Sequence, residues 1–186
     1  MSISNDSPFY PQSYRSELSL RNKIGRALWG VAWTLLFRPS PRPCFGWRRW
    51  LVKCFGGKIA PDAVIYPSAR IYAPWNLEMG PRSCLGDFVD CYCVDKIRLG
   101  ADAIVSQYAF LCTAGHDIDS PARTLTTGPI TLKPGAWVFA RAFIGPGVTI
   151  HRGAVVAACS VVVKDVASMT VIAGNPARVI RQRKDF

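Results

Sequence analysis

Only two histidines, His116 and His151, occur among the 186 residues, and histidine is the side chain best suited to move a proton near neutral pH. With an unperturbed pKa of about 6.5, the neutral ring can act as a general base toward a hydroxyl group. His151 follows the apolar Ile150 at a position that should face solvent. His116 opens the segment HDIDSPARTLTTGP, which interrupts an otherwise regular spacing of aliphatic residues. His116 is therefore the candidate catalytic base.

The cysteines do not predict a metal site or a disulfide framework. They are odd in number and contain no C-x-x-C pair, so free thiols are expected. Tetrahedral zinc needs about four ligands, and no second close pair accompanies Cys91 and Cys93. The seven are Cys44, Cys54, Cys84, Cys91, Cys93, Cys112 and Cys159.

Charge and hydropathy argue against nucleic-acid-binding, membrane-spanning and secreted proteins. The net charge is +11, and residues 1–58 hold ten basic side chains against two acidic ones. No zinc-finger spacing or aromatic RNA-binding motif accompanies this charge, so a nucleic-acid partner is not expected. No apolar run reaches the ~20 residues that span a bilayer, and residues 1–10 do not resemble a secretory signal. The expected location is cytoplasmic, with a peripheral position at the inner face of the membrane as an open alternative.

A six-residue repeat runs through the chain after residue 58. An aliphatic residue recurs at every sixth position, and a mostly small residue stands four positions after it. The aliphatic series are Ile59, Ile65, Ile71, Leu77; then Met79, Leu85, two residues out of phase; then Leu99, Val105, Leu111; then Leu132, Val138, Ile144, Ile150, Val156, Val162. The small residues include Ala103, Ala109, Gly115, Ala136, Ala142, Ala154 and Ser160.

A period of six fits neither an amphipathic helix nor a simple alternating strand, but it fits a coil of three short strands joined by tight turns. Glycines such as Gly100 and Gly153 would supply turn conformations that a Cβ atom disfavours. We expect a mainly β parallel β-helix over residues 58–166, with an inserted loop around residues 116–130. A basic, apolar helical extension is expected over residues 1–57, and a C-terminal tail or short helix over residues 167–186.

Several stretches carry a resemblance to a known family. They are APWNLEMG at 73–80, VSQYAFLCTAGHDIDSP at 105–121, GPGVTI at 145–150, VVVKDV at 161–166 and VIAGNPARVIR at 171–181. The chain resembles the hexapeptide-repeat acyltransferases, and within them the colanic acid biosynthesis acetyltransferases. The resemblance implies a left-handed coil, a homotrimer and O-acetyl transfer from acetyl-CoA, a co-substrate and not a resident cofactor, to a sugar or glycan precursor.

Under this resemblance His116 removes a proton from the acceptor hydroxyl while the hydroxyl oxygen attacks the thioester, without an acyl-enzyme. A carboxylate of Asp117, Asp119 or Asp90, or a backbone carbonyl, would orient the ring. Family members often place an amide near the acceptor, at a position that aligns here with Cys93. Asp90, Cys93, Ser106 and Gln107 are therefore the candidate acceptor contacts.

The resemblance also implies a coenzyme A groove between subunits. Ala140 and Ala158 would lie near the pantetheine arm, and Lys164 and Arg181 would reach the phosphates. Two positions depart from the family pattern: Val163 stands where threonine is common, and Cys159 stands where glycine is usual.

The N-terminal region predicts two short helices, RNKIGRALWGVAWTLLFR and FGWRRWLVKCFGG, separated by the proline-rich residues 39–43. Trp, Leu and Phe beside Arg and Lys is the composition of a helix that lies at a membrane surface. Peripheral membrane contact through residues 21–56 is one hypothesis, and capping of the coil or packing against a neighbouring subunit is the other.

Other classes of protein that use this coil fit less well. A γ-type carbonic anhydrase needs three zinc-binding histidines, and this chain has two. A sugar nucleotidyltransferase needs a separate phosphate-binding domain, for which the chain is too short. A non-catalytic scaffold or membrane-associated binding module of a glycan-assembly complex remains the alternative to an enzyme.

Overall fold

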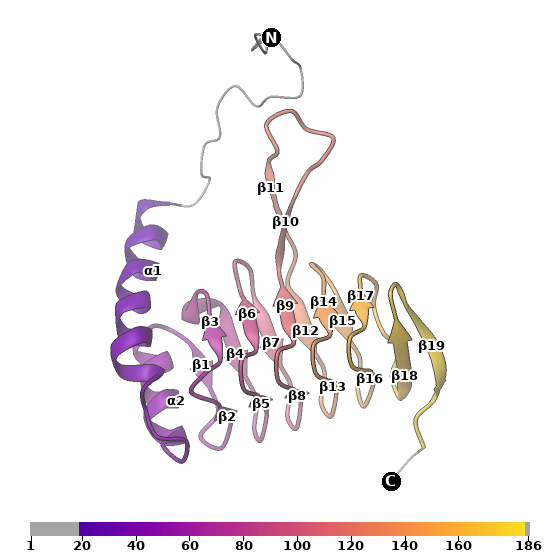
Figure 1. Ribbon diagram of the computed structural model, residues 1–186, viewed down its shortest axis with the longest axis horizontal. Helices are drawn as coiled ribbons and strands as arrows, with labels where there is room; N and C mark the ends of the chain where they lie inside the picture. The colour runs from indigo at the N-terminus through magenta and orange to yellow at the C-terminus, as the bar shows by residue number, and fades with distance from the viewer. Residues whose placement is uncertain (1–18, 185–186) are drawn as a thin grey trace, which may run out of the picture.

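The computed structural model describes residues 19–184, which form a three-sided coil of parallel strands with two helices at one end (Figure 1). The first sheet contains β1 (Lys58–Ile59), β4 (Leu77–Met79), β7 (Ile97–Leu99), β12 (Ile130–Leu132) and β15 (Thr149–Ile150). The second contains β2 (Val64–Ile65), β5 (Cys84–Leu85), β8 (Ile104–Val105), β13 (Trp137–Val138), β16 (Val155–Val156), β18 (Thr170–Gly174) and β19 (Ala177–Gln182). The third contains β3 (Arg70–Ile71), β6 (Asp90–Tyr92), β9 (Phe110–Cys112), β14 (Phe143–Ile144) and β17 (Val161–Val162).

The six-residue repeat fills the interior of the coil. Its aliphatic members from Leu132 to Val162 are at most 2% exposed, and the small residues four positions later are at most 3% exposed. Ile144 lies in register with Leu111 on one neighbouring turn and with Val162 on the other. Each turn therefore buries its apolar residues only against the next turns, as expected for a solenoid, and the predicted parallel β-helix is confirmed.

The corners of the coil do not depend on glycine in the expected way. Gly153 has a positive φ of 65°, as predicted, but Gly100 does not belong to the positive-φ residues. A Cβ atom at Gly100 would lie 2.7 Å from the backbone nitrogen of Pro134, so close approach of two turns explains this glycine. Several corners instead place larger residues in the left-handed region, including Arg141 and Cys159.

A short 3-10 helix, η2 (Pro74–Asn76), explains the phase shift of the repeat. Ile59 pairs with Met79, so the first turn of the coil is twenty residues long and η2 takes up the excess. The oversized Trp75 within it is half-buried and packs against Gly25 and Gly56, where the helical region meets the coil.

The N-terminal helices cap the first turn. They are α1 (Leu20–Ala32), which continues as the π-helix η1 (Trp33–Phe37), and α2 (Phe45–Cys54). Their side chains donate to carbonyls of the first coil turn, with which no earlier turn pairs among the described residues. The donors and acceptors are Trp29 to Ile71 (2.6 Å), Trp33 to Ala69 (2.9 Å), Arg48 to Ile65 (2.6 Å) and Arg49 to Ala63 (2.9 Å). The inner face of residues 21–56 therefore caps the coil, as one of the two hypotheses for this segment predicted.

The other end of the coil closes with strands and not with a helix, so the helical alternative for residues 167–186 is wrong over residues 167–184, and residues 185–186 lie outside the described residues. β18 extends the second sheet in parallel beside β16, and β19 folds back on β18 in antiparallel register. Ile172 is buried in the core of the coil and Val171 is buried on the outer side of β18, whereas the side chains along β19 are mostly exposed.

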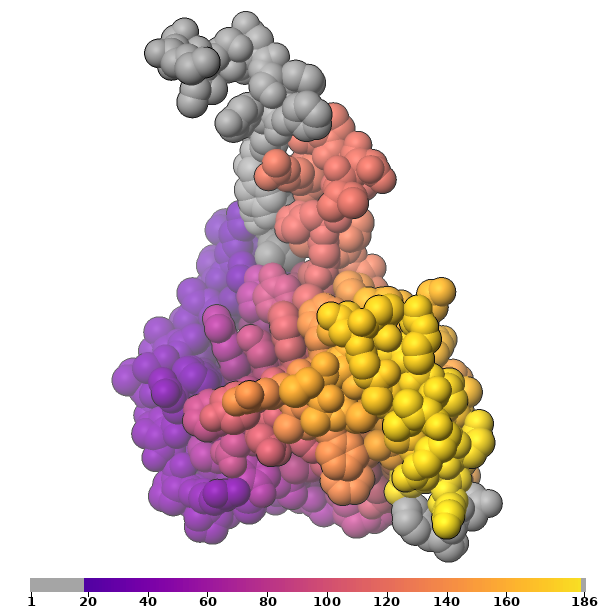
Figure 2. All heavy atoms as spheres, turned by 45° about the vertical axis from the view of Figure 1, so that its right-hand side comes forward, coloured from indigo at the N-terminus to yellow at the C-terminus, as the bar shows by residue number. Residues whose placement is uncertain are grey.

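A second hairpin leaves the coil between the third and first sheets. β10 (Ala114–His116) and β11 (Leu125–Thr127) pair in antiparallel fashion, and the hairpin stands out from the body of the molecule (Figures 1 and 2). The expected inserted loop thus begins slightly earlier and contains two strands. Gly115, which the repeat assigned to a corner of the coil, pairs with Thr126 in this hairpin instead.

Candidate active site

Thr113 fixes the base of the hairpin that carries His116. It is fully buried, and its hydroxyl donates to the carbonyl of Tyr92 (2.8 Å) while accepting from the backbone N–H of Asp95 (3.0 Å). Its own carbonyl accepts from the N–H of Gly128 (2.9 Å), where the chain returns to the coil. One residue therefore ties both ends of the hairpin to the preceding turn, and the sequence alone did not single it out.

The hairpin also holds the ring of His116. Nδ1 lies 2.7 Å from the carbonyl oxygen of Arg123, which faces it across the hairpin. A carbonyl oxygen can only accept, so Nδ1 carries the proton in this hydrogen bond and Nε2 is the basic nitrogen of the neutral ring. His116 is exposed at the surface of the hairpin.

A backbone carbonyl, rather than a carboxylate, thus makes the hydrogen bond to Nδ1. Asp117 accepts from the backbone N–H of Asp119 (3.0 Å), which shapes the start of the hairpin tip. Asp90 lies on the outer face of β6, half-buried, and burial raises the pKa of its carboxyl group against the opposing effect of Arg70. Sequence reasoning left carboxylates and carbonyls open, and the structure favours a carbonyl because the hairpin places Arg123, two residues before β11, opposite the ring.

The other predicted acceptor contacts fall in different places. Cys93 is fully buried, and its thiol donates to the carbonyl of Ala73 (3.2 Å), so the expected contact of Cys93 with an acceptor is wrong. Ser106 accepts from the indole N–H of Trp137 (3.0 Å), and Gln107 is exposed in the same turn. Both precede β9, whereas His116 follows it, so within one chain they lie at the opposite end of that strand.

An aromatic wall covers the outer face of the third sheet beside the hairpin. Tyr72 and Tyr92 meet edge to face at 4.6 Å between ring centroids, Tyr92 and Phe110 at 6.3 Å, and Phe110 and Phe143 at 5.4 Å. Arg26 of α1 lies 4.7 Å from the centre of the Tyr72 ring. Sequence reasoning missed this wall; the spacing of Tyr72 and Tyr92, equal to one long turn of the coil, was its signal.

The predicted coenzyme A residues lie near the end of the second sheet. Ala140 and Ala158 occupy the same corner on successive turns, where the carbonyl of Ala140 accepts from the N–H of Cys159 (3.0 Å). Ala158 and Arg181 line one groove of about 320 Å³ together with Trp137, Phe139, Val155, Ala157, Val171 and Arg183. The structure therefore brings Ala158 and Arg181 together.

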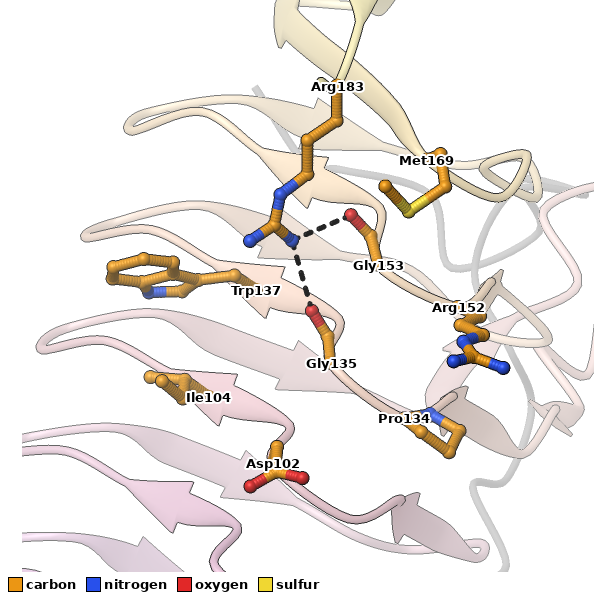
Figure 3. A pocket seen from close by; sticks show the side chains of 9 residues that line it. All are labelled: Asp102, Ile104, Pro134, Gly135, Trp137, Arg152, Gly153, Met169 and Arg183. Atoms are coloured by element: carbon orange, nitrogen blue, oxygen red, sulfur yellow. Dashed lines mark hydrogen bonds between the residues drawn. The ribbon is translucent and has the colours of Figure 1, made fainter. Parts of the chain in front are cut away.

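A larger pocket of about 650 Å³ adjoins this groove and shares Trp137 and Arg183 with it (Figure 3). The guanidinium of Arg183 donates to the carbonyls of Gly153 (2.9 Å) and Gly135 (3.4 Å), and Arg152 lies on the far rim. Asp102, at the other edge, forms a bidentate pair with Arg82, whose hydrogen bonds lower the pKa of that carboxyl group. Trp137, Arg152 and Arg183 were not predicted from the sequence.

Lys164 does not lie in either of these pockets. It lines a separate cavity of about 730 Å³ beyond β17, beside Arg178 and Val179 of the C-terminal hairpin. Within one chain the two predicted phosphate contacts, Lys164 and Arg181, are thus divided between two cavities.

Residues 19–184, the part of the chain that the structure describes, contain neither a metal-binding cluster nor a membrane-spanning helix. In this part of the chain no three His, Cys, Asp or Glu side chains gather to hold a metal ion. Over the same residues, every helix is too short or too polar to cross a bilayer.

Solved structures identify the class of fold. A maltose O-acetyltransferase from Clostridium difficile matches with a TM-score of 0.79 and 24% identity, over 90% of this chain and 90% of its own. A galactoside acetyltransferase in complex with coenzyme A matches with a TM-score of 0.77 and 24% identity, over 91% of this chain and 86% of its own. The fold is the parallel β-solenoid shared by these proteins.

Sequence relatives identify the family. A protein of Escherichia coli K12 named as the colanic acid biosynthesis acetyltransferase WcaF is 40% identical over 162 residues, which are 87% of this chain and 89% of the relative. The galactoside O-acetyltransferase of the same organism is 30% identical over 145 residues, 74% of this chain and 70% of the relative. No family model matches the chain. The chain belongs to the hexapeptide-repeat acetyltransferases, as the sequence motifs predicted, and it is an enzyme of acetyl transfer.

Proposed function

We propose that this protein transfers an acetyl group from acetyl-CoA to a hydroxyl of a sugar or glycan precursor in polysaccharide biosynthesis, with His116 as general base. The observation that carries the proposal is the 2.7 Å hydrogen bond between Nδ1 of His116 and the carbonyl of Arg123. It holds the ring in the tautomer in which Nε2 accepts a proton. The name of the relative WcaF and the coenzyme A bound to the galactoside acetyltransferase support the choice of pathway and donor.

The step balances without a resident cofactor. Nε2 takes the proton from the acceptor hydroxyl as the oxygen forms a bond to the thioester carbonyl carbon. The carbonyl oxygen becomes an oxyanion that an N–H or polar side chain must stabilise. The C–S bond then breaks, and the coenzyme A thiolate leaves with the proton returned by the imidazolium. The products are the acetyl ester and free coenzyme A.

The aromatic wall supports a sugar as the acceptor. The face of a pyranose ring that carries C–H groups is apolar and packs on aromatic rings, while hydroxyl groups at its edge need polar partners. Tyr92 presents such a ring, and Asp90 lies beside it on the same strand. We assign acceptor binding to this face of the third sheet, next to the hairpin.

The position of the coenzyme A groove supports a trimer. His116 follows the corner after the third sheet, whereas Ala140 and Ala158 lie at the corner before it. One chain thus presents the base and the groove at opposite ends of β9 and β14, and a neighbouring copy would bring its groove to the first chain's hairpin. In the proposed homotrimer, the pantetheine arm of coenzyme A runs past Ala140 and Ala158. Its phosphates are bound by Arg181, from one cavity, and by Lys164, from the other.

The catalytic role is tested by His116→Ala in a thiol-release assay with acetyl-CoA and a panel of nucleotide-linked and lipid-linked sugars. Loss of a positioned general base should lower kcat by about 10²–10⁴ fold. Circular dichroism and thermal unfolding should match the wild type, because the side chain is exposed. A variant that folds and keeps full turnover would support the non-catalytic scaffold instead.

The intersubunit site is tested by mixing two inactive variants, His116→Ala and Ala158→Trp, in one assembly. If each site takes the base from one chain and the groove from another, random trimers should recover about one quarter of wild-type activity. Each variant alone should stay inactive while keeping the trimer mass by light scattering. A monomer mass for the wild type, or no recovery on mixing, contradicts the shared site.

A further inference from the structure

Helix α1 lies at one end of the coil (Figure 1), and an apolar stripe is exposed along α1 and η1. Its members recur at helical spacing and are well exposed, whereas Trp29, on the opposite side of the helix, is 2% exposed. The stripe consists of Leu20 (72% exposed), Ile24 (52%), Leu28 (59%), Val31 (60%) and Leu35 (66%). Contiguous apolar surface of this kind usually marks an interaction site.

Two tryptophans of α2 extend the stripe. Trp47 and Trp50 stack at 5.0 Å between ring centroids and are 40% and 55% exposed. The indole N–H of Trp47 donates to the carbonyl of Leu36 (2.9 Å), which places the pair directly beside the end of the stripe. Tryptophan, with an apolar ring and one polar N–H, is characteristic of membrane interfaces.

Capping of the coil does not need these side chains. The cap uses the inner residues Trp29, Trp33 and Arg48, which bond to carbonyls of the first turn. The stripe and the Trp47–Trp50 pair lie on the outer surface, so their apolar character has no role in holding the coil closed.

The charge around the stripe indicates what it binds. Residues 19–57 contain eight Lys and Arg and no Asp or Glu. Arg21, Lys23, Arg38 and Lys53 are exposed in this segment. Two copies meeting through the same face would bring these like charges together, which is unfavourable, whereas an anionic lipid surface attracts them. We infer that the stripe and the Trp47–Trp50 pair bind the surface of an anionic membrane, with the coil axis directed away from it.

This surface can be tested by flotation of the full-length protein with lipid vesicles. Wild type should float with vesicles of phosphatidylcholine containing roughly one-third phosphatidylglycerol, and much less with phosphatidylcholine alone. The double variant Leu28→Glu/Leu35→Glu should reduce the bound fraction at least about tenfold, because two apolar side chains can no longer enter the interface. Replacing Arg21 and Lys23 by Gln should weaken binding about fivefold for each charge removed, and added salt should act in the same direction.

Ile180→Glu is the matched control, because Ile180 is 60% exposed on β19 at the other end of the molecule. It should float like wild type. The inference is overturned if wild type floats with neither vesicle, or if Leu28→Glu/Leu35→Glu floats as well as wild type. A lower assembly mass for the double variant by light scattering would instead make the stripe an interface between copies and would also overturn it. None of these outcomes depends on acetyl transfer, which the thiol-release assay measures separately.

Discussion

The coil and the β10–β11 hairpin differ in what their side chains do. Along the coil, every sixth residue points inward and is almost completely shielded from solvent, and stability comes from apolar burial against neighbouring turns. The hairpin has little interior: Ile118 near its tip is 90% exposed, and its geometry rests on hydrogen bonds from Thr113 and across to His116. The coil therefore sets the stability of the protein, while the hairpin sets the position of the candidate base.

A matched pair of isoleucine substitutions should separate the two regions most strongly. Ile144→Ala removes a fully buried side chain between Leu111 and Val162 and should lower the free energy of unfolding by about 2–5 kcal/mol. Ile118→Ala changes an exposed side chain and should alter the free energy of unfolding by less than about 0.5 kcal/mol. Urea unfolding at one fixed protein concentration measures both, since assembly affects apparent stability. Equal losses would mean that the hairpin tip is buried in the assembly.

The base of the hairpin should show an intermediate effect with a second readout. Thr113→Val keeps the shape of the side chain but removes the donor to Tyr92 and the acceptor for the N–H of Asp95. Loss of these buried hydrogen bonds should cost about 1–3 kcal/mol of stability. Because Thr113 also positions the hairpin, kcat in the thiol-release assay should fall while the Michaelis constant for acetyl-CoA changes little.

Thr131→Val, on the outer face of β12, is the control for this change and should alter stability by less than about 0.5 kcal/mol. If Thr113→Val lowers stability but leaves kcat at the wild-type value, Thr113 supports the fold without positioning His116.

The two regions were also unequally predictable from the sequence. Burial in the coil repeats, so Leu132, Val138 and their successors reveal the fold through spacing alone. The hairpin was visible only as an interruption of that spacing, and the partner of His116, the carbonyl of Arg123, belongs to the backbone and has no sequence signature. The aromatic wall joins Tyr92 to Phe110 and Phe143 on successive turns, which becomes apparent only when the turns are stacked.

The ends of the coil were partly predictable. Apolar and basic composition indicated the N-terminal helices, but not that Arg48 would be buried to satisfy a carbonyl of the first turn. Buried and exposed residues do not alternate along β19, because this strand is exposed on most of its length. The sequence therefore did not predict the antiparallel pairing of β19 with β18. Arg183 acquires its place beside Trp137 only through that pairing.

The smallest expected effect concerns a corner of the coil at the coenzyme A groove. The resemblance to the family predicts glycine at the position of Cys159, and the φ of Cys159, 59°, lies in the left-handed region that residues with a Cβ atom disfavour by about 1–2 kcal/mol. Cys159→Gly relieves this strain but increases the freedom of the unfolded chain, so the net gain should be about 0.5–1 kcal/mol in urea unfolding. Because the thiol is exposed beside Ala158, the same change should leave turnover within about twofold if pantetheine passes Ala158 without using the sulfur. Lower stability in the glycine variant would show that the thiol makes a favourable contact in the assembly, and this corner would then belong to the interface between subunits.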